Sequence, residues 1–187
     1  VTYYPIGEAQ FAAMLEDLER AEHFIFLEYF IIREDSYMWR RILEVLERKA
    51  AQGLDVRLMY DDLGSVALLP GNYWLQMEKK GIKCLAFNPF VPFVSLVMNN
   101  RDHRKILVVD GHTAYNGGIN LSDEYINRTH PHGHWKDTGV RLVGEGVWNF
   151  TVMFLQTWNA FRRTDKDFEQ FRPHIHHPAP FAGSGHV

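Results

Sequence analysis

The sequence predicts a single α/β domain in which a largely parallel or mixed β-sheet is flanked by helices. Apolar runs of strand length alternate with amphipathic segments of helical period in the order β-α-β-α-β, which is typical of such a sheet. The length of 187 residues suits one hydrophobic core, and 46% hydrophobic with 23% charged residues excludes disorder as the main state. Ligand sites in these sheets usually lie beyond the carboxyl ends of the strands.

The first half of the chain supplies the alternating elements. Phe11, Met14 and Leu18 share one helical face and predict a helix over residues 8 to 22. Residues 24 to 32 are apolar except at Glu28, as expected for a strand buried on both faces. The remaining predicted elements are a helix from about Trp39 that ends at Gly53, a strand at 54 to 60, a short helix at 72 to 80 and a strand at 82 to 87.

The second half begins with an apolar stretch, residues 88 to 100, that Pro89 and Pro92 prevent from forming a helix or a central strand. We therefore predict a loop there. The next predicted elements are a hairpin of strands 104 to 110 and 113 to 117 around Gly111 and His112, a polar loop at 118 to 136, a strand at 138 to 143 and a helix at about 145 to 162. From residue 163 the chain is rich in Pro and His and is predicted to be a linker.

Composition also indicates which classes of partner and which cellular compartment are expected. A net charge of -3 disfavours nucleic acid, because phosphate-backbone binding usually needs a basic excess. The single cysteine, Cys84, lies in an apolar run, so we predict a core residue and a reducing compartment. No stretch reaches the roughly 18 uninterrupted apolar residues of a bilayer span, so we expect the chain itself to be soluble. Because it begins at Val1 without methionine, we also expect a fragment of a longer protein.

The strongest chemical signal is the pattern His-x-Lys-x-x-x-x-Asp formed by His103, Lys105 and Asp110. Strand alternation places His103 and Lys105 on one face, where an imidazole and an ammonium can converge on one anionic group. Asp110 has the opposite parity, which predicts a supporting role. The alternative is that His103 and Lys105 are merely exposed on an edge strand.

A second group of residues follows the first at a short distance. Gly117 and Gly118 let a backbone approach a ligand closely, and the Asn120 amide can donate to a phosphate oxygen. With His103 and Lys105 these residues predict a phosphate site. A neutral imidazole can attack phosphorus to give a phosphohistidine, while Lys105 and Asn120 stabilise the charge that develops. The leaving alkoxide needs a proton donor, so the mechanism requires a second histidine opposite the first.

This arrangement resembles the phospholipase D superfamily, whose signature is the same His-Lys-Asp motif followed by Gly-Gly or Gly-Ser, x, Asn. The resemblance implies that two such halves meet at a pseudo-two-fold axis. One histidine becomes phosphorylated and the other protonates the leaving alcohol, with no metal and no cofactor. The sequence holds one motif, so the partner is expected to be a second half of the same chain or a homodimer mate.

Within that superfamily, residues 3 to about 172 resemble the first catalytic half of bacterial cardiolipin synthases. The matching segments are Phe-Leu-Glu-Tyr-Phe-Ile (26 to 31), Met-Tyr-Asp-Asp-Leu-Gly-Ser (59 to 65), the two motif segments (100 to 111 and 117 to 125) and Trp-Lys-Asp-Thr (135 to 138). The resemblance implies a catalytic half-domain at 1 to 162 and a linker at 163 to 187 towards the missing half. It also implies membrane-spanning helices before this region, phosphatidylglycerol as substrate, and a parent enzyme at the cytoplasmic face of the cell membrane.

The same resemblance implies a role for one further acidic residue, and the positions of two others in the apolar strands make them candidates as well. Asp137 stands where the family carries the residue that orients the nucleophilic histidine. Its alternative is a solvated charge at a strand edge. Glu28 and Asp61 interrupt or end apolar strands, and each either lines the site or holds a backbone donor.

Two segments beside the motif have open interpretations. Histidines recur at two-residue spacing at His130, His132 and His134, and the tail carries His174, His176 and His177. Imidazoles at this spacing can share a divalent ion. Pro131 and Gly133 instead favour a mobile loop that binds no metal. The apolar segment at 90 to 98 either packs in the core or faces lipid and leads acyl chains towards His103.

Three hypotheses about function follow. The first is half of a phosphatidyltransferase that converts two phosphatidylglycerol molecules into cardiolipin and glycerol. The second is a single-motif phosphodiesterase that homodimerises and cleaves nucleic acid, which the net charge disfavours. The third is a folded half that is catalytically silent without its partner.

Overall fold

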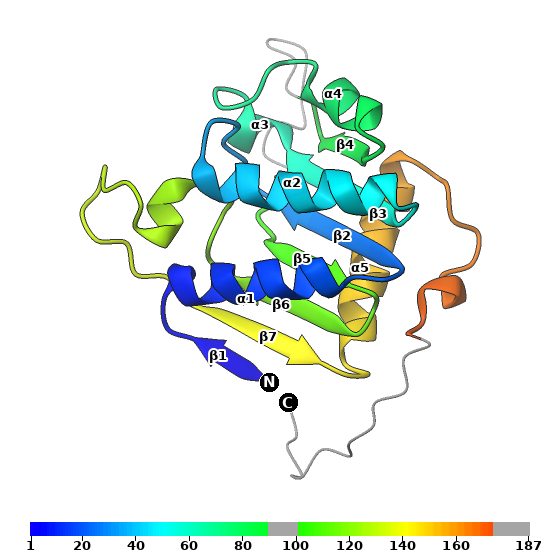
Figure 1. Ribbon diagram of the computed structural model, residues 1–187. Helices are drawn as coiled ribbons and strands as arrows, with labels where there is room; N and C mark the ends of the chain where they lie inside the picture. The colour runs from blue at the N-terminus through cyan, green and yellow to red at the C-terminus, as the bar shows by residue number, and fades with distance from the viewer. Residues whose placement is uncertain (90–100, 174–187) are drawn as a thin grey trace.

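The computed structural model describes residues 1–89 and 101–173. These residues form one seven-stranded mixed sheet in the order β1-β7-β6-β5-β2-β3-β4, with helices on both faces (Figure 1). The strands are β1 (Thr2–Tyr4), β2 (Phe24–Tyr29), β3 (Asp55–Asp61), β4 (Lys83–Phe87), β5 (Ile106–Val109), β6 (Thr113–Gly117) and β7 (Gly139–Val143). The α-helices are α1 (Gly7–Arg20), α2 (Tyr37–Ala51), α3 (Asp62–Ser65), α4 (Tyr73–Lys79) and α5 (Val147–Phe161), and the 3₁₀ helices are η1 (Asp123–Ile126) and η2 (Glu169–Phe171).

The predicted α/β class is confirmed, and the sheet is mixed rather than largely parallel. Only β2, β3 and β4 run parallel, joined by helical crossovers. From β2 outwards, β5, β6, β7 and β1 each pair antiparallel with their neighbour. The physical reason lies in the connections, because the short turn between β5 and β6 permits only an antiparallel pair.

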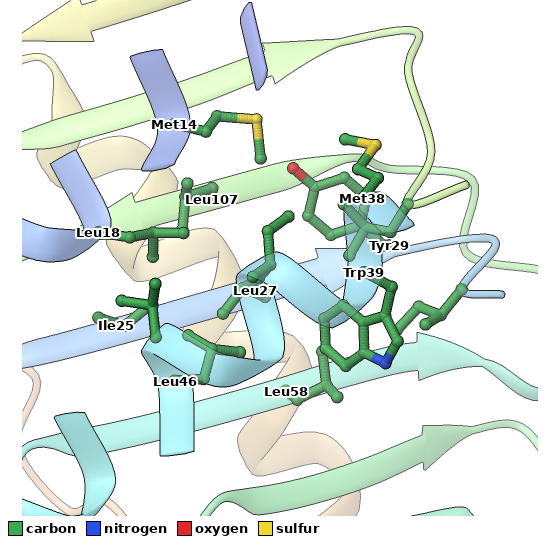
Figure 2. Close-up of a cluster of buried hydrophobic side chains, with 14 of the residues drawn as sticks. Met14, Leu18, Ile25, Leu27, Tyr29, Met38, Trp39, Leu46, Leu58 and Leu107 are labelled. Carbon is green, nitrogen blue, oxygen red and sulfur yellow. The ribbon is translucent and has the colours of Figure 1, made fainter. Parts of the chain in front are cut away.

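Helices α1 and α2 cover one face of the sheet and form the larger part of the core with it (Figure 2). Each buried Leu or Met of this layer contributes roughly 1.5–3 kcal/mol relative to an exposed position. Cys84 is buried in this core as predicted, and burial raises the pKa of its thiol. The side chains that meet between the two helices and the sheet are Met14, Leu18, Met38, Trp39 and Leu46 from the helices and Ile25, Leu27, Tyr29, Leu58 and Leu107 from the strands.

Helix α5 covers the opposite face of the sheet. Phe26 of β2 stacks on Phe154 of α5 with ring centroids 4.7 Å apart, and Trp158 lies one turn further along. Because alternate residues of β2 enter the two layers, the whole strand is buried, as its continuous apolar run predicted. Glu28 shares the parity of Phe26, which places a carboxyl group on the α5 side of the sheet.

Strands β2 and β5 are shorter than the sequence predicts. β2 ends at Tyr29 rather than at residue 32, and β5 begins at Ile106 rather than at residue 104. Before β5, backbone N–H groups donate to side chains instead of to a neighbouring strand. The Asp102 N–H donates to the Asp61 carboxylate, and the Arg104 N–H donates to the Asp102 carboxylate. His103 and Lys105 therefore lie in an irregular segment that enters β5.

The packed domain continues beyond residue 162, where the sequence predicts a linker. Arg57 is buried in β3, and its guanidinium binds the carboxylate of Asp165 as well as that of Asp55. The ring of Phe171 in η2 makes T-shaped contacts with the rings of Phe24 and Phe26. A buried guanidinium must be neutralised, so the chain after α5 is held against the sheet.

The described part of the chain holds no helix that combines the length and apolarity needed to cross a bilayer.

Candidate active site

The motif lies at one end of the sheet, where several strands meet. Glu28 at the end of β2 pairs with Ile106 at the start of β5, and Gly117 at the end of β6 pairs with Gly139 at the start of β7. The segments that precede β5, follow β6 and precede β7 thus converge at this edge. It is also the edge at which β2, β3 and β4 present their carboxyl ends, the usual position of a ligand site in an α/β sheet.

His103 and Lys105 lie against the same aromatic ring, that of Phe30 just after β2. The His103 and Phe30 ring centroids are 4.8 Å apart in an edge contact, and the Lys105 ammonium lies 5.3 Å from the centre of the Phe30 ring. The His103 imidazole is exposed, whereas Lys105 is only 5% exposed and donates from Nζ to the His103 carbonyl at 2.6 Å. The two side chains therefore share one side of the chain, as strand parity predicts.

Burial changes the pKa of the Lys105 ammonium group. Removal of the ammonium from water lowers the pKa of Lys105 to about 8, and the carboxylates of Asp102 and Asp137 oppose this shift. The ammonium stays mostly charged at neutral pH but is poorly solvated. An incoming phosphate would find a cation whose water has already been removed, which strengthens the attraction.

Asp137 reaches the site through an electrostatic interaction with Lys105. Among the described residues no hydrogen bond joins Asp137 to the His103 ring; Thr138 N–H donates to Asp137 Oδ1 at 2.8 Å, and Trp135 Nε1 lies 3.4 Å from Oδ2. The orienting role of Asp137 therefore stays a prediction.

Gly117 and Gly118 are required by close neighbours within the chain. A Cβ on Gly118 would lie 2.0 Å from Asp137 Oδ1, and one on Gly117 would lie 2.5 Å from the Thr138 carbonyl oxygen. Either contact is far below van der Waals separation. The glycine pair lets the start of β7 and the Asp137 side chain just before it approach the end of β6.

Asn120 is 3% exposed and is used to join parts of the fold. Its Oδ1 accepts from the Ile31 N–H at 3.0 Å, and its Nδ2 donates to the Tyr125 hydroxyl at 2.8 Å. The sequence predicts a phosphate donor here. The amide nitrogen carries a second hydrogen, so the phosphate role of Asn120 stays a prediction beside the structural role that the contacts show.

Asp110 directly follows β5, whereas His103 precedes this strand, so the two residues lie at its two ends. Its carboxylate accepts from three backbone N–H groups, those of Glu22, His23 and Phe24, at 2.8 to 2.9 Å. Asp110 and Gly111 have φ of 53° and 65° and form the hairpin turn, which the sequence places one residue later. Asp-Gly suits such a turn because both residues tolerate positive φ. These contacts are those of a bracing residue, and Asp110 lies at the opposite end of β5 from His103.

Replacement of Asp110 by alanine is expected to destabilise the chain by about 2–5 kcal/mol in urea unfolding. Three backbone donors would lose their acceptor, and alanine would occupy a left-handed conformation. Asp110→Asn keeps one acceptor oxygen and tolerates the same φ, so it should cost about half as much. A stability change below about 0.5 kcal/mol for Asp110→Ala would contradict the bracing role.

Asp61 holds the backbone in front of His103. One carboxylate oxygen accepts from the Gly64 N–H at the start of α3, and the other accepts from the Asp102 N–H at 2.9 Å. Arg101 also approaches Asp61, with 3.4 Å between Nη1 and Oδ1. Asp61 is 1% exposed, so of its two sequence interpretations the structure shows the one that holds backbone donors.

Asp102 and Arg104 flank His103, and neither residue was predicted from the sequence to belong to the site. Arg104 grips the Asp102 carboxylate with Nε and Nη2, each at 2.8 Å, and Nη2 lies 2.7 Å from Glu28 Oε1. Glu28 is 1% exposed, and desolvation raises the pKa of its carboxyl group to about 10. The sequence signal that indicates this cluster is the pair of opposite charges on either side of His103. In an extended segment Asp102 and Arg104 point to the same side, away from His103, where they can form an ion pair.

Among the described residues no cluster of three or more His, Cys, Asp or Glu side chains is arranged to hold a metal ion. His130, His132 and His134 are exposed. The tail histidines from His174 onwards and the apolar segment at 90 to 98 lie outside the described residues.

Comparison with solved structures defines the class of fold. The chain resembles a phosphatidylserine synthase from Haemophilus influenzae, with a TM-score of 0.66 and 13% identity over 91% of this chain and 41% of that one. It also resembles NucT from Helicobacter pylori, with a TM-score of 0.63 and 10% identity over 84% of this chain and 94% of that one. Nuc from Salmonella typhimurium, a phospholipase D family member, gives a TM-score of 0.59 and 18% identity over 84% and 91% of the two chains. The fold is therefore phospholipase D-like.

Comparison of sequences identifies a family within this fold. A family model described as "Cardiolipin synthase, PLD-like domain" matches residues 14–133, and the chain belongs to this family. A cardiolipin synthase of Geobacillus thermodenitrificans is 40% identical over 81% of this chain and 30% of its own length. An uncharacterized protein of Streptococcus mutans is 53% identical over 94% of this chain and 37% of its own length. The chain thus spans about a third of the length of these curated relatives.

Proposed function

We propose that this chain supplies one half of the active site of a phosphatidyltransferase that converts two phosphatidylglycerol molecules into cardiolipin and glycerol. The observation that carries the proposal is the exposed His103 imidazole beside the buried Lys105 ammonium, both against Phe30. Membership of the cardiolipin synthase family supports the substrate class.

The reaction proceeds in two displacements. A ring nitrogen of His103 attacks the phosphorus of the first phosphatidylglycerol and forms an N–P bond, while the P–O bond to the glycerol headgroup breaks. The glycerol alkoxide takes a proton from a histidine opposite His103. That histidine then accepts the proton of a hydroxyl group on the second phosphatidylglycerol, whose oxygen displaces His103 and gives cardiolipin.

The remaining site residues support these displacements. Lys105 neutralises charge on the equatorial phosphate oxygens, helped by the second amide hydrogen of Asn120. Asp137 orients His103, Gly117 and Gly118 make room for the approach of Asp137, and Asp110 braces the far end of β5. The reaction as written requires no metal and no cofactor.

The second histidine comes from a partner. The 187 residues contain one His-x-Lys-x-x-x-x-Asp motif, and the relatives are about three times as long. We propose a second catalytic half on the same polypeptide, in a parent enzyme that works at the cytoplasmic face of the membrane on its lipid substrate. Nucleic acid is a disfavoured partner at a net charge of -3.

One observation favours a second candidate, a homodimeric phosphodiesterase. The chain matches 91% of Nuc and 94% of NucT, so solved chains of this fold exist at about the length of this chain. Two copies of this chain would then bring two His103 side chains together. The isolated chain is catalytically silent if it stays monomeric.

Trapping of the covalent intermediate tests the proposal. The full-length protein that contains this chain is incubated with phosphatidylglycerol labelled with ³²P, quenched in alkaline denaturant and digested. We expect an acid-labile, alkali-stable label on the peptide with His103, because a phosphoramidate has this stability. His103→Asn should abolish the label, whereas His23→Asn, an exposed histidine at the other end of β2, should keep it. Label on another residue in the wild type would reject His103 as the nucleophile.

A further inference from the structure

The two residues that flank His103 belong to a cluster of charged side chains beneath it. Asp102 and Glu28 are buried, and Arg104 is about one-third exposed. Asp102 and Arg104 lie in the segment before β5, and Glu28 lies in β2. The reaction steps above use none of its three side chains, although the proposed nucleophile lies between two of them.

Asp102 and Arg104 close a ring around His103. Besides the paired bonds from the guanidinium, the Arg104 backbone N–H donates to Asp102 Oδ1 at 3.1 Å. Three bonds thus join the residue before His103 to the residue after it. The guanidinium also donates to Thr157 Oγ1 of α5 at 3.0 Å, which anchors the ring to the helix. The backbone of His103 has little freedom left within such a ring.

The ring is tied to the sheet by acidic side chains from two strands. Asp61 of β3 accepts the Asp102 backbone N–H. Glu28 of β2 lies 2.7 Å from Arg104, and its carboxyl group interacts with the Asp102 carboxyl group, which shares the same guanidinium. Two carboxyl groups in contact require one proton between them, because two buried carboxylates would repel.

The contacts favour Glu28 as the carboxyl group that carries this proton. Neither Glu28 oxygen accepts a well-aligned hydrogen bond from the described residues, whereas Asp102 accepts three from Arg104. With Glu28 neutral, one carboxylate faces one guanidinium and the cluster is balanced. Burial of the Glu28 side chain acts in the same direction, since desolvation is the largest cause of its raised pKa.

We propose that Glu28 and Asp102 are positioning residues for His103: the neutral Glu28 carboxyl group donates to Asp102, and the Asp102–Arg104 ring then fixes where the imidazole stands. The His103 ring makes an edge contact with the Phe30 ring and no hydrogen bond to the described residues, so the bonds that hold its backbone determine where the ring lies. A displacement of about 1 Å in a nucleophile can cost about 100-fold in rate. The inference rests on the proposed role of His103 as nucleophile.

The test uses two replacements of Glu28 in the full-length protein. Glu28→Gln keeps the size, the neutral charge and a donor towards Asp102, so we expect kcat within about threefold of wild type. Glu28→Ala removes the donor and leaves a void, so we expect kcat to fall by about 30- to 100-fold while KM changes by less than about threefold. Asp17→Ala serves as the matched control. Asp17 is buried and paired with Arg141, in a pocket shared with Asp110 at the far end of β5, so its loss should lower Tm without lowering kcat.

An infrared measurement tests the proton independently of activity. The difference spectrum between wild type and Glu28→Gln at neutral pH should contain the carbonyl band of a protonated carboxylic acid. A carboxylate band instead, or a kcat for Glu28→Gln as low as that of Glu28→Ala, would overturn the neutral Glu28. Wild-type kcat in Glu28→Ala would overturn the positioning role. Full activity of a His103→Ala variant would instead reject the proposed nucleophile, so the two failures are distinguishable.

Discussion

Replacement of His103 by alanine in the full-length protein is expected to reduce the formation of cardiolipin from phosphatidylglycerol by at least about 10⁴-fold. The imidazole is proposed to form the covalent bond to phosphorus, and no described side chain beside it can substitute: Lys105 is buried and Phe30 is inert. Release of labelled glycerol and appearance of cardiolipin should fall together, because both follow the same covalent step.

The control for this loss is the stability of the variant. The His103 side chain is exposed and makes no hydrogen bond to the described residues, so His103→Ala should unfold within about 0.5 kcal/mol of wild type. His23→Ala, also exposed, should retain activity. If His103→Ala keeps more than about a tenth of the wild-type rate, the residual activity must come from another nucleophile and the proposed mechanism is wrong.

Replacement of Lys105 by methionine is expected to lower kcat/KM by about 10²- to 10³-fold. Methionine preserves the apolar contact with Phe30 but removes the charge that neutralises the phosphate oxygens. Lys105→Arg is the matched control, because it keeps a positive charge but not the compact geometry of an ammonium. Its loss should be smaller than that of Lys105→Met, and equal losses would show that the charge is not what matters.

The same residue predicts a pH dependence. Since the pKa of Lys105 is about 8 in the folded chain, the ammonium is lost as pH rises through that value. The kcat/KM of the wild type should therefore fall above about pH 8, whereas Lys105→Arg should lack this limb because a guanidinium stays protonated. An unchanged alkaline limb in Lys105→Arg would assign the titration to another group.

Stability should change with pH in the opposite direction. An unfolded lysine has a pKa of about 10.4, so between about pH 8 and that value the unfolded chain binds more protons at Lys105 than the folded chain does. The contribution of Lys105 to the free energy of unfolding therefore rises with pH in this window. At neutral pH the buried charge is unfavourable, and urea unfolding should show Lys105→Met to be more stable than wild type. Burial thus favours phosphate binding at a cost in stability.

The predicted helices and central strands agree with the structure wherever a periodic apolar pattern was long enough to be recognised. β2 is the clearest case, because burial on both faces requires the continuous apolar run that the sequence shows. β1 and α3 were missed, since elements of three and four residues carry no period. Pairing with β7 makes Thr2–Tyr4 a strand, and the Asp61 cap defines the start of α3.

In the candidate site, too, local patterns were predictable and contacts between distant segments were not. His103 and Lys105 were found from a local motif, and their common side follows from parity alone. The contacts of Asp110, and the contact of Asn120 with the Ile31 N–H, were not predictable, because these partners lie 86 to 89 residues away in the sequence. The close neighbour that requires Gly118 is Asp137, which the sequence places at the start of the strand after the His-rich loop, 19 residues further along the chain.

By itself, the sequence determined the order of helices and strands, the burial of the central strands and the shared side of His103 and Lys105, since each depends on residues a few positions apart. Only the tertiary structure decided that β5, β6 and β7 add antiparallel to β2, that Asp110 braces a distant loop, and that Glu28, Asp102 and Arg104 meet beneath His103. Periodicity reports which face of an element is buried. The partner on that face is set by the order of strands in the sheet, which local periodicity does not encode.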